Sequence, residues 1–164
     1  METSKKKIDI LEHIIAAVAG AYYNINLTRN LVPGQMYQAV DGKEYNVNEI
    51  TGLPADAKFS EVIDYWGKRL SEKEKEAYYA FFDIPVLLKH YEKGETHVTH
   101  TYWTQTIRQR PMLAEHHIVM YEDEENGDIL AISYIRDITE EFHENALKIE
   151  AENLNKRLRK EKEH

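Results

Sequence analysis

Histidine is the residue of this sequence best suited to metal chemistry, because the chain has eight histidines and no cysteine. His97 and His100 are three residues apart in a segment of strand-like composition, so their side chains are expected on opposite faces. His116 and His117 are adjacent and are expected to point in opposite directions for the same reason. Without cysteine ligands and without converging histidines, we predict no metal site.

Catalytic motifs do not emerge from the sequence either. It contains no G-x-S-x-G nucleophile elbow, no phosphate-binding P-loop and no H-E-x-x-H zinc motif. The acidic residues 122–125 fall in a predicted exposed turn, where charges protect a sheet edge instead of working in a cleft. We therefore predict that the chain is not an enzyme and that no residue is catalytic, and we keep a small α+β enzyme as a minor alternative.

A binding pocket is the remaining candidate site, because apolar and aromatic residues from several segments have the spacing to converge. The candidate ligand-binding residues are Tyr23, Ile25, Leu27, Trp66, Leu87, Val98, His100 and Tyr102. If the strand over 95–106 has the opposite parity, His97 and Trp103 face the pocket instead. The same side chains can equally fill a core and leave no cavity.

The elements that must position these residues begin with helical spacing of apolar residues in 8–19, followed by alternation over 21–28 and a weaker strand signal over 35–40. Three short helices are predicted over 59–70, 71–82 and 84–94. Ser71 and Glu74 form a capping-box pattern, and Pro85 fits the first turn of the third helix.

After Gly94 the pattern changes to strands, predicted over 95–106, 113–121 and 129–136. Asn126-Gly127 is a strong hairpin signal between the last two. Strands grouped into blocks, with the helices between the blocks, are typical of the α+β class, with an antiparallel sheet and helices on one face.

The tail from Thr139 consists almost entirely of helix-forming residues. Leu147, Ala151, Leu154 and Leu158 are spaced as a coiled-coil seam, and Phe142 belongs to a second apolar stripe offset from it. A helix with so narrow an apolar stripe is marginal alone, so we predict that it pairs with its own copy in a parallel homodimer. The predicted coiled-coil residues are Phe142, Leu147, Ala151, Leu154 and Leu158.

Length and charge exclude several functions. The 164 residues suit one domain with an appendage, and the net charge of −8 gives no electrostatic basis for binding nucleic acid. The longest apolar run, Ile14–Tyr23, is too short for a membrane span, and the acidic residues before it argue against a signal peptide. A cytoplasmic location is the default expectation.

One motif resembles a known family. Following the predicted hairpin, the residues Arg136-Asp137-Ile138-Thr139-Glu140-Glu141 lead into the helical tail. This motif closely resembles the signature with which the last strand of a PAS domain passes into its signalling helix. The resemblance covers about Ile14–Thr139 and implies a five-stranded antiparallel sheet whose helices enclose a small pocket. It divides the chain into an N-terminal flanking helix (1–20), a PAS domain (21–139) and a C-terminal coiled-coil linker helix (140–164).

The resemblance also implies a function. A PAS-like module binds a small molecule or partner and passes a conformational change through its C-terminal helix to an output domain, most often a histidine kinase or a diguanylate cyclase, which this chain lacks. The alternative is a structural PAS dimerisation module without a ligand. The missing cysteines exclude the flavin and coumaric-acid photosensory chemistries, and haem held by His90 is disfavoured because Leu87 better defines the inward helix face.

Two residues of the motif have an independent physical role. Asp137 and Thr139 are expected to precede the helix and to accept hydrogen bonds from its first amides, with Asp137 and Glu140 at capping-box spacing. A strand that ends in such a cap can transmit a distortion of the sheet to the helix, so we assign signal transmission to Asp137 and Thr139.

Overall fold

The computed structural model describes residues 21–40, 42–106 and 108–162. Its elements are β1 (Ala21–Asn26), β2 (Tyr37–Val40), β3 (Lys43–Asn46), α2 (Val47–Thr51), α3 (Phe59–Gly67), α4 (Glu72–Phe81), α5 (Ile84–Glu92), β4 (His97–Gln105), β5 (Pro111–Glu122), β6 (Ile129–Asp137) and α6 (Thr139–Lys162). The helix expected within 1–20 lies outside the described residues.

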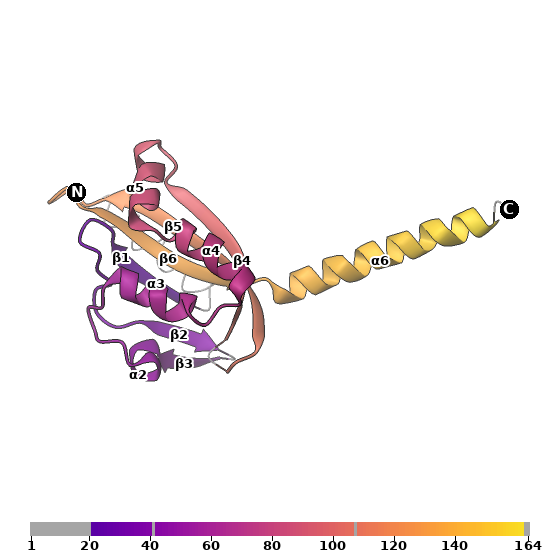
Figure 1. The fold of residues 1–164 in the computed structure, drawn as a ribbon, viewed down its shortest axis with the longest axis horizontal. Helices are drawn as coiled ribbons and strands as arrows, with labels where there is room; N and C mark the ends of the chain where they lie inside the picture. Colours follow the sequence, from indigo (N-terminus) through magenta and orange to yellow (C-terminus); the bar gives the residue numbers. More distant parts are fainter. Residues whose placement is uncertain (1–20, 41, 107, 163–164) are drawn as a thin grey trace.

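A single antiparallel sheet forms the centre of the fold, in the order β3-β2-β1-β6-β5-β4 (Figure 1). The first strand therefore lies beside the last, with Tyr23 opposite Ser133. The α+β class is confirmed, and the sheet has six strands where five were expected. The additional strand is β3, a four-residue edge strand whose sequence, KEYN, lacks the apolar alternation that would have predicted it.

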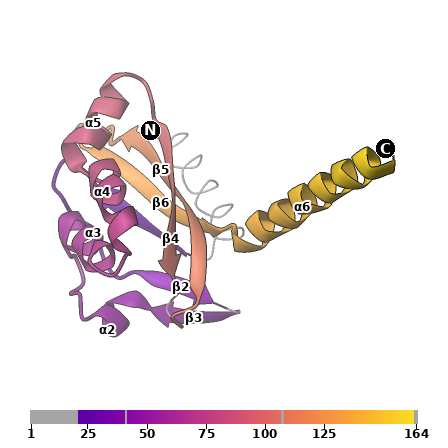
Figure 2. The same cartoon turned by 45° about the vertical axis from the view of Figure 1, so that its right-hand side comes forward.

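The helices α3, α4 and α5 cover one face of this sheet, as Figures 1 and 2 show. The apolar stripe of α3 is turned to the core, where Phe59, Val62 and Ile63 are buried. Leu87 of α5 is fully buried against the same core. This inner face of the sheet, beneath the helices, is where the candidate pocket residues converge, because strand residues of one parity point toward it.

Of the two helix-start signals predicted for α4 and α5, one is confirmed and the other is wrong. Pro85 lies in the first turn of α5, as predicted. The capping box of α4 does not form: Ser71 stands at the N-cap, but its side chain makes no capping hydrogen bond. Asn46 instead caps α2, a helix missed in the sequence, by accepting a hydrogen bond from the Glu49 backbone N–H at 3.1 Å.

The predicted hairpin between β5 and β6 is present. Gly127 has a φ of +76°, which a residue without a Cβ adopts at no steric cost. Asp128, which follows it, accepts hydrogen bonds from Asn26 at 2.9 Å and Arg29 at 2.8 Å. These contacts tie the hairpin to the end of β1, because β1 and β6 are neighbours in the sheet.

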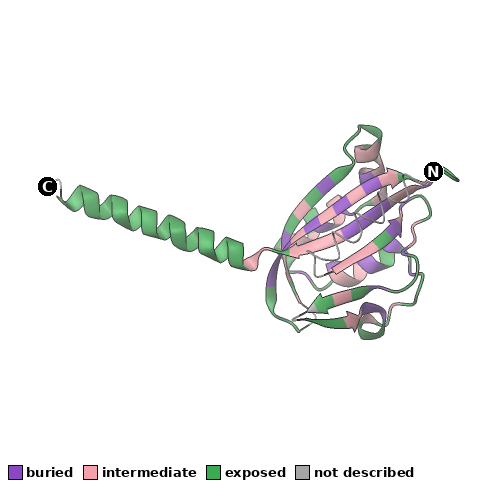
Figure 3. Ribbon diagram, turned by 180° about the vertical axis from the view of Figure 1, so that it is seen from behind, coloured by how far each residue is buried: buried purple, intermediate pink, exposed green. Residues whose placement is uncertain are grey.

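The last helix, α6, extends away from the sheet, and none of its residues is buried (Figure 3). Its exposed large apolar residues are Phe142, Leu147, Ile149, Leu154 and Leu158. An isolated helix of this kind gains little from packing within its own chain. No helix in the described part of the chain combines the length and apolar character needed to cross a membrane.

Candidate functional site

A small, partly open cavity of about 60 Å³ lies between the sheet and the helices. Three of the eight predicted pocket residues line it: Tyr23 from β1, Trp66 from α3 and Tyr102 from β4. The rest of its wall consists of Gln38, Tyr78, Thr104, Gln105, Met112, His116 and Ile135. The structure thus brings residues from five strands and two helices to one point that the sequence indicated only in part.

The other predicted pocket residues do not line this cavity. Ile25, Leu27, Leu87 and Val98 are buried in the packed core, which is the alternative role considered for them. They hold the strands and helices together around the cavity, but they have no access to it in this structure.

The pairing of β4 with β5 shows which side chains of β4 face the core. His100 and Tyr102 face inward with Val98, since His100 lies opposite the buried His116 of β5. The inverted alternative is wrong, because His97 contacts His117 and Trp103 contacts Phe142 of α6, with ring centroids 5.5 Å apart. His97 and His100 therefore lie on opposite faces, as their spacing predicted.

A buried histidine connects two strands at the cavity wall. His116 Nδ1 lies 2.8 Å from the Tyr102 hydroxyl oxygen, and His116 Nε2 lies 2.6 Å from the Ser133 hydroxyl oxygen. Burial, with smaller contributions from the neighbouring His117 and His100, lowers the pKa of His116 to about 3. His116 is therefore neutral at physiological pH, with one ring nitrogen donating and the other accepting.

The tyrosines of the cavity also remain uncharged. Burial raises the pKa of Tyr23 to about 12, against a smaller opposing effect of its hydrogen bond with Ser133. Burial likewise raises the pKa of Tyr102, and the nearby Tyr23 adds to the shift. A polar but neutral lining favours an uncharged ligand, because a charged one would lose its hydration without gaining a counter-charge.

His100 extends this cluster but lies outside the cavity wall. Its ring is stacked between Phe81 and Tyr102, with centroids 5.2 and 5.5 Å away. Its Nε2 is buried and has no hydrogen-bond partner in the described part of the chain. Burial lowers the pKa of His100, so this nitrogen belongs to a neutral ring and is an unsatisfied polar atom of the kind that core packing normally avoids.

A larger hollow of about 350 Å³ adjoins the cavity at the end of the sheet where α6 begins. Gln38, Met112 and Ile135 line both spaces. The hollow is further lined by Asp137 and Thr139. One continuous wall therefore runs from the buried tyrosines and histidine to the first residues of the exit helix.

The start of α6 differs in detail from the expected cap. Thr139 is the first residue of the helix instead of preceding it. The Thr139 backbone N–H donates to Asp137 Oδ1 at 3.0 Å, so Asp137 does act as an acceptor. The Thr139 hydroxyl, however, accepts from the Leu113 backbone N–H at 2.9 Å, which links the helix to β5.

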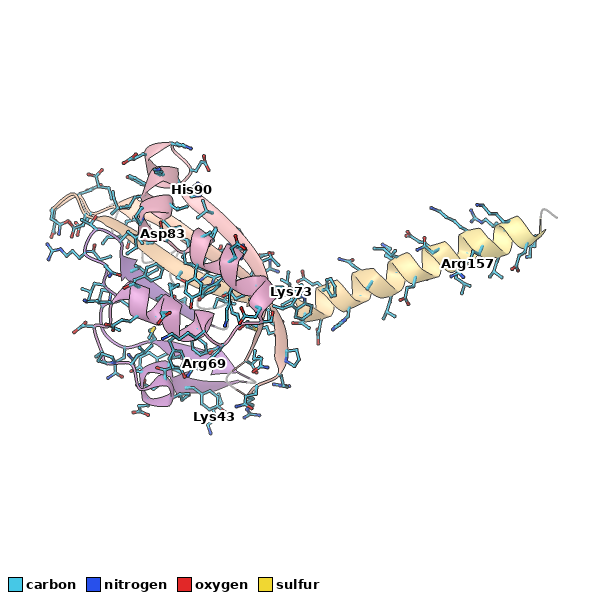
Figure 4. The ribbon with its side chains drawn as sticks, in the orientation of Figure 1. Lys43, Arg69, Lys73, Asp83, His90 and Arg157 are labelled. Atoms are coloured by element: carbon cyan, nitrogen blue, oxygen red, sulfur yellow. The ribbon has the colours of Figure 1, made fainter. Side chains whose placement is uncertain are left out.

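His90 is held at the surface end of α5 (Figure 4). Its Nδ1 lies 2.9 Å from Glu95 Oε2, and a third of its side chain is exposed. The inward face of α5 belongs to Leu87, as expected. This placement gives His90 no apolar pocket in which to hold a haem as an axial ligand.

His116 and Ser133 are the important residues that the sequence interpretation missed. Their polar side chains lie on strands that otherwise place Ala114, Ile118 and Ala131 in the core. The signal was available, since a histidine in phase with Ala114 and Ile118 must face inward. The contacts of His116 with Tyr102 and Ser133 could not be predicted from the sequence, because they depend on the register between β4, β5 and β6.

In the described residues, no group of three or more His, Asp or Glu side chains is arranged to hold a metal ion.

Comparison with known proteins adds a likeness of fold. No protein-family model matches the sequence. No curated protein matches it.

Solved structures do align with the chain. The N-terminal domain of a diguanylate cyclase with PAS/PAC sensor from Marinobacter aquaeolei is 16% identical, with a TM-score of 0.45, over 75% of this chain and 98% of that one. A sensory box histidine kinase/response regulator from Burkholderia thailandensis is 14% identical, with a TM-score of 0.47, over 89% and 98%. The PAS domain of the fruit-fly ELK potassium channel is 14% identical, with a TM-score of 0.44, over 80% and 97%. In fold, the chain is similar to PAS domains, the family that residues 136–141 resemble.

Proposed function

We propose that this chain is a sensory module that binds a small molecule, with an uncharged polar group beside the Tyr102–His116 pair, and passes the change through α6 to an output partner. The observation that carries this proposal is the shared wall of the two spaces. Gln38, Met112 and Ile135 line both the inner cavity and the hollow at the start of α6. A ligand in the hollow would touch this wall and Asp137 or Thr139 at the same time.

The sizes of the two spaces decide where such a ligand would sit. Ligand pockets typically have about 300–1,000 Å³, and the inner cavity of about 60 Å³ is well below that range. The hollow, with about 350 Å³, falls within it. We therefore place the body of the ligand in the hollow, with one hydroxyl or amide group reaching the polar lining of the inner cavity.

The exit helix supplies the route to a partner. The Thr139 hydroxyl is hydrogen-bonded to the Leu113 backbone N–H of β5. Arg136 of β6 forms an ion pair with Glu141 of α6 at 3.2 Å. A ligand signals only if it favours one arrangement of this junction over another. We propose that α6 pairs with a second copy through Leu147, Ala151, Leu154 and Leu158, and that a histidine kinase or diguanylate cyclase domain receives the change.

A specific observation favours a second candidate function. The inner cavity is small, and four of the predicted pocket residues are packed in the core. A filled core without a ligand is what a purely structural dimerisation module requires. In this alternative, the same α6 contacts join two chains, and the hollow at its start stays empty.

Native mass spectrometry of the purified full chain distinguishes the two functions. We expect a retained small molecule in the wild type, and its loss in Ala39→Trp, where the new indole side chain fills the hollow. Ser60→Trp, at an exposed position in α3 that does not line the hollow, is the matched control and should retain it. A dimer that remains empty after gentle purification would support the structural module instead.

A further inference from the structure

The outer face of the sheet, opposite the helices, carries a histidine pair that the sequence did not place together. Thr99 of β4 lies opposite His117 of β5, so His97, two residues before Thr99, is the diagonal neighbour of His117 on the same face. His97 Nε2 lies 2.7 Å from His117 Nδ1. His97 is exposed, and 13% of the His117 side chain is accessible, so solvent reaches the pair.

The surroundings of His117 determine which of its nitrogens is free to accept. Its Nε2 lies 2.5 Å from Glu115 Oε1. Glu115 Oε1 also accepts a hydrogen bond from Arg136 Nη1 at 2.9 Å, so a carboxylate paired with a guanidinium accepts from His117. His117 Nε2 therefore carries the proton, and the lone pair of His117 Nδ1 points at His97.

The plane of the His117 ring is also held in place. Tyr134 of β6 stacks on it with ring centroids 4.4 Å apart and planes 3° from parallel. A carboxylate that accepts from one imidazole nitrogen while the other nitrogen binds a metal is the usual outer shell of histidine metal sites, where it orients the ring and raises its basicity. Glu115 and Tyr134 thus pre-orient His117 Nδ1 as a ligand.

We propose that His97 Nε2 and His117 Nδ1 form a bidentate site for a divalent transition-metal ion such as Zn²⁺ or Cu²⁺. Imidazole nitrogen suits these ions, whereas Mg²⁺ and Ca²⁺ prefer oxygen ligands. With metal–nitrogen distances of about 2.0–2.1 Å, two nitrogens on one tetrahedral ion are about 3.3 Å apart. Because the two nitrogens point at each other in the hydrogen bond, the exposed His97 side chain must rotate and shift its Nε2 by about 2 Å before both lone pairs can meet on the ion.

The proton balance of this step is simple. In the metal-free pair, His97 Nε2 carries the proton that it donates to His117 Nδ1. When the ion binds, the His97 proton moves from Nε2 to Nδ1 of the same ring through solvent, so both rings stay neutral and no net proton is lost.

Two protein ligands leave the remaining positions to water, so the ion exchanges with solvent and is not a structural zinc, which has four protein ligands. The Thr99 hydroxyl lies 3.3 Å from His117 Nδ1, where it can hydrogen-bond to such a water. The site is linked to α6, because Glu115 also binds Arg136 at 2.9 Å and Arg136 binds Glu141. The inference goes beyond the proposed function and does not depend on it.

The test is calorimetric titration of the full chain with ZnCl₂. We expect the wild type to bind one ion per chain. His97→Asn and His117→Asn should each lose at least tenfold in affinity, because a single remaining imidazole cannot chelate the ion. For the same reason, the double variant His97→Asn/His117→Asn should lose no further affinity. Glu115→Gln should weaken binding about 10–100-fold while keeping both ligands. The double variant His90→Asn/His143→Asn, which changes two histidines distant from the pair, should bind as the wild type does.

A spectroscopic readout keeps the test valid even if His117→Asn folds poorly. The Cu²⁺ electron paramagnetic resonance spectrum should show two coordinated imidazole nitrogens in the wild type and one in His97→Asn, whose exposed position makes it tolerant of substitution. Wild-type affinity in His97→Asn, or an unchanged spectrum in that variant, would overturn the assignment. So would loss of binding in the His90/His143 control.

Discussion

The Thr139 hydroxyl oxygen lies 2.9 Å from the Leu113 backbone nitrogen, so the first residue of α6 is hydrogen-bonded to β5. The Ile138 backbone N–H donates to the Leu113 carbonyl oxygen at 3.0 Å, immediately before it. The same residue of β5 therefore both donates to and accepts from the junction. Together these bonds set the direction in which α6 leaves the sheet.

Thr139→Val should remove one of these bonds while keeping the shape of the side chain. The partly buried Leu113 N–H then loses its partner, and we expect the free energy of unfolding to fall by about 1–2 kcal/mol. Urea unfolding followed by circular dichroism measures this change. Thr101→Val, at an exposed position of β4, is the matched control and should leave stability within about 0.5 kcal/mol of the wild type. Equal effects of the two substitutions would contradict the assigned role of Thr139.

The buried His116 should make the stability of the fold depend on pH. Its pKa of about 3 in the folded chain is below the ordinary value of 6.5, so between these two values the unfolded chain binds more protons. The free energy of unfolding should therefore fall as the pH is lowered from 6.5 toward 3, by up to about 1.4 kcal/mol per pH unit from this group. Above pH 6.5 the contribution of His116 is constant.

His116→Gln isolates that contribution, because glutamine keeps a donor and an acceptor but does not titrate. Urea unfolding at pH 7, 6, 5 and 4 should give a shallower decline in the variant than in the wild type, whatever their difference at pH 7. Carboxylates add the same slope to both proteins, so the difference between the curves reports His116 alone. Parallel curves would show that burial does not hold this imidazole neutral.

The exposed seam of α6 should control oligomeric state. Leu147 and Leu154 are 66% and 51% exposed in the single chain, and replacing both with serine removes their apolar contribution to a helix pair. Sedimentation equilibrium should show a dimer for the wild type and a monomer for Leu147→Ser/Leu154→Ser. Ile149→Ser, 57% exposed but outside the seam, should remain dimeric. A wild-type chain that is monomeric at high concentration would rule out the coiled-coil proposal.

Much of the fold could be predicted because local signals and tertiary packing agree. Asn126-Gly127 predicted the hairpin, and the apolar stripe of α3 predicted which of its faces is buried. The strand β3 was missed because a short edge strand is defined by its hydrogen bonds to β2, and no apolar pattern marks it. Its pairing is a property of the assembled sheet.

The site was less predictable because its contacts depend on register. The sequence showed that His97 and His100 point in opposite directions, but only the pairing of β4 with β5 decides which one faces inward. The same pairing creates the His116–Tyr102 contact on the inner face and the His97–His117 contact on the outer face. Residue spacing along one strand carries no information about such diagonal neighbours on another.

The additional strand β3 has a consequence for aggregation. It forms one edge of the sheet, is four residues long, and exposes Lys43 and Glu44. Short, charged edge strands discourage the addition of a strand from another molecule. The opposite edge, β4, is nine residues long and carries no Lys, Arg, Asp or Glu. Any edge-to-edge polymerisation of this protein should therefore start at β4 and stop at β3, which limits growth to pairs of sheets and disfavours fibrils.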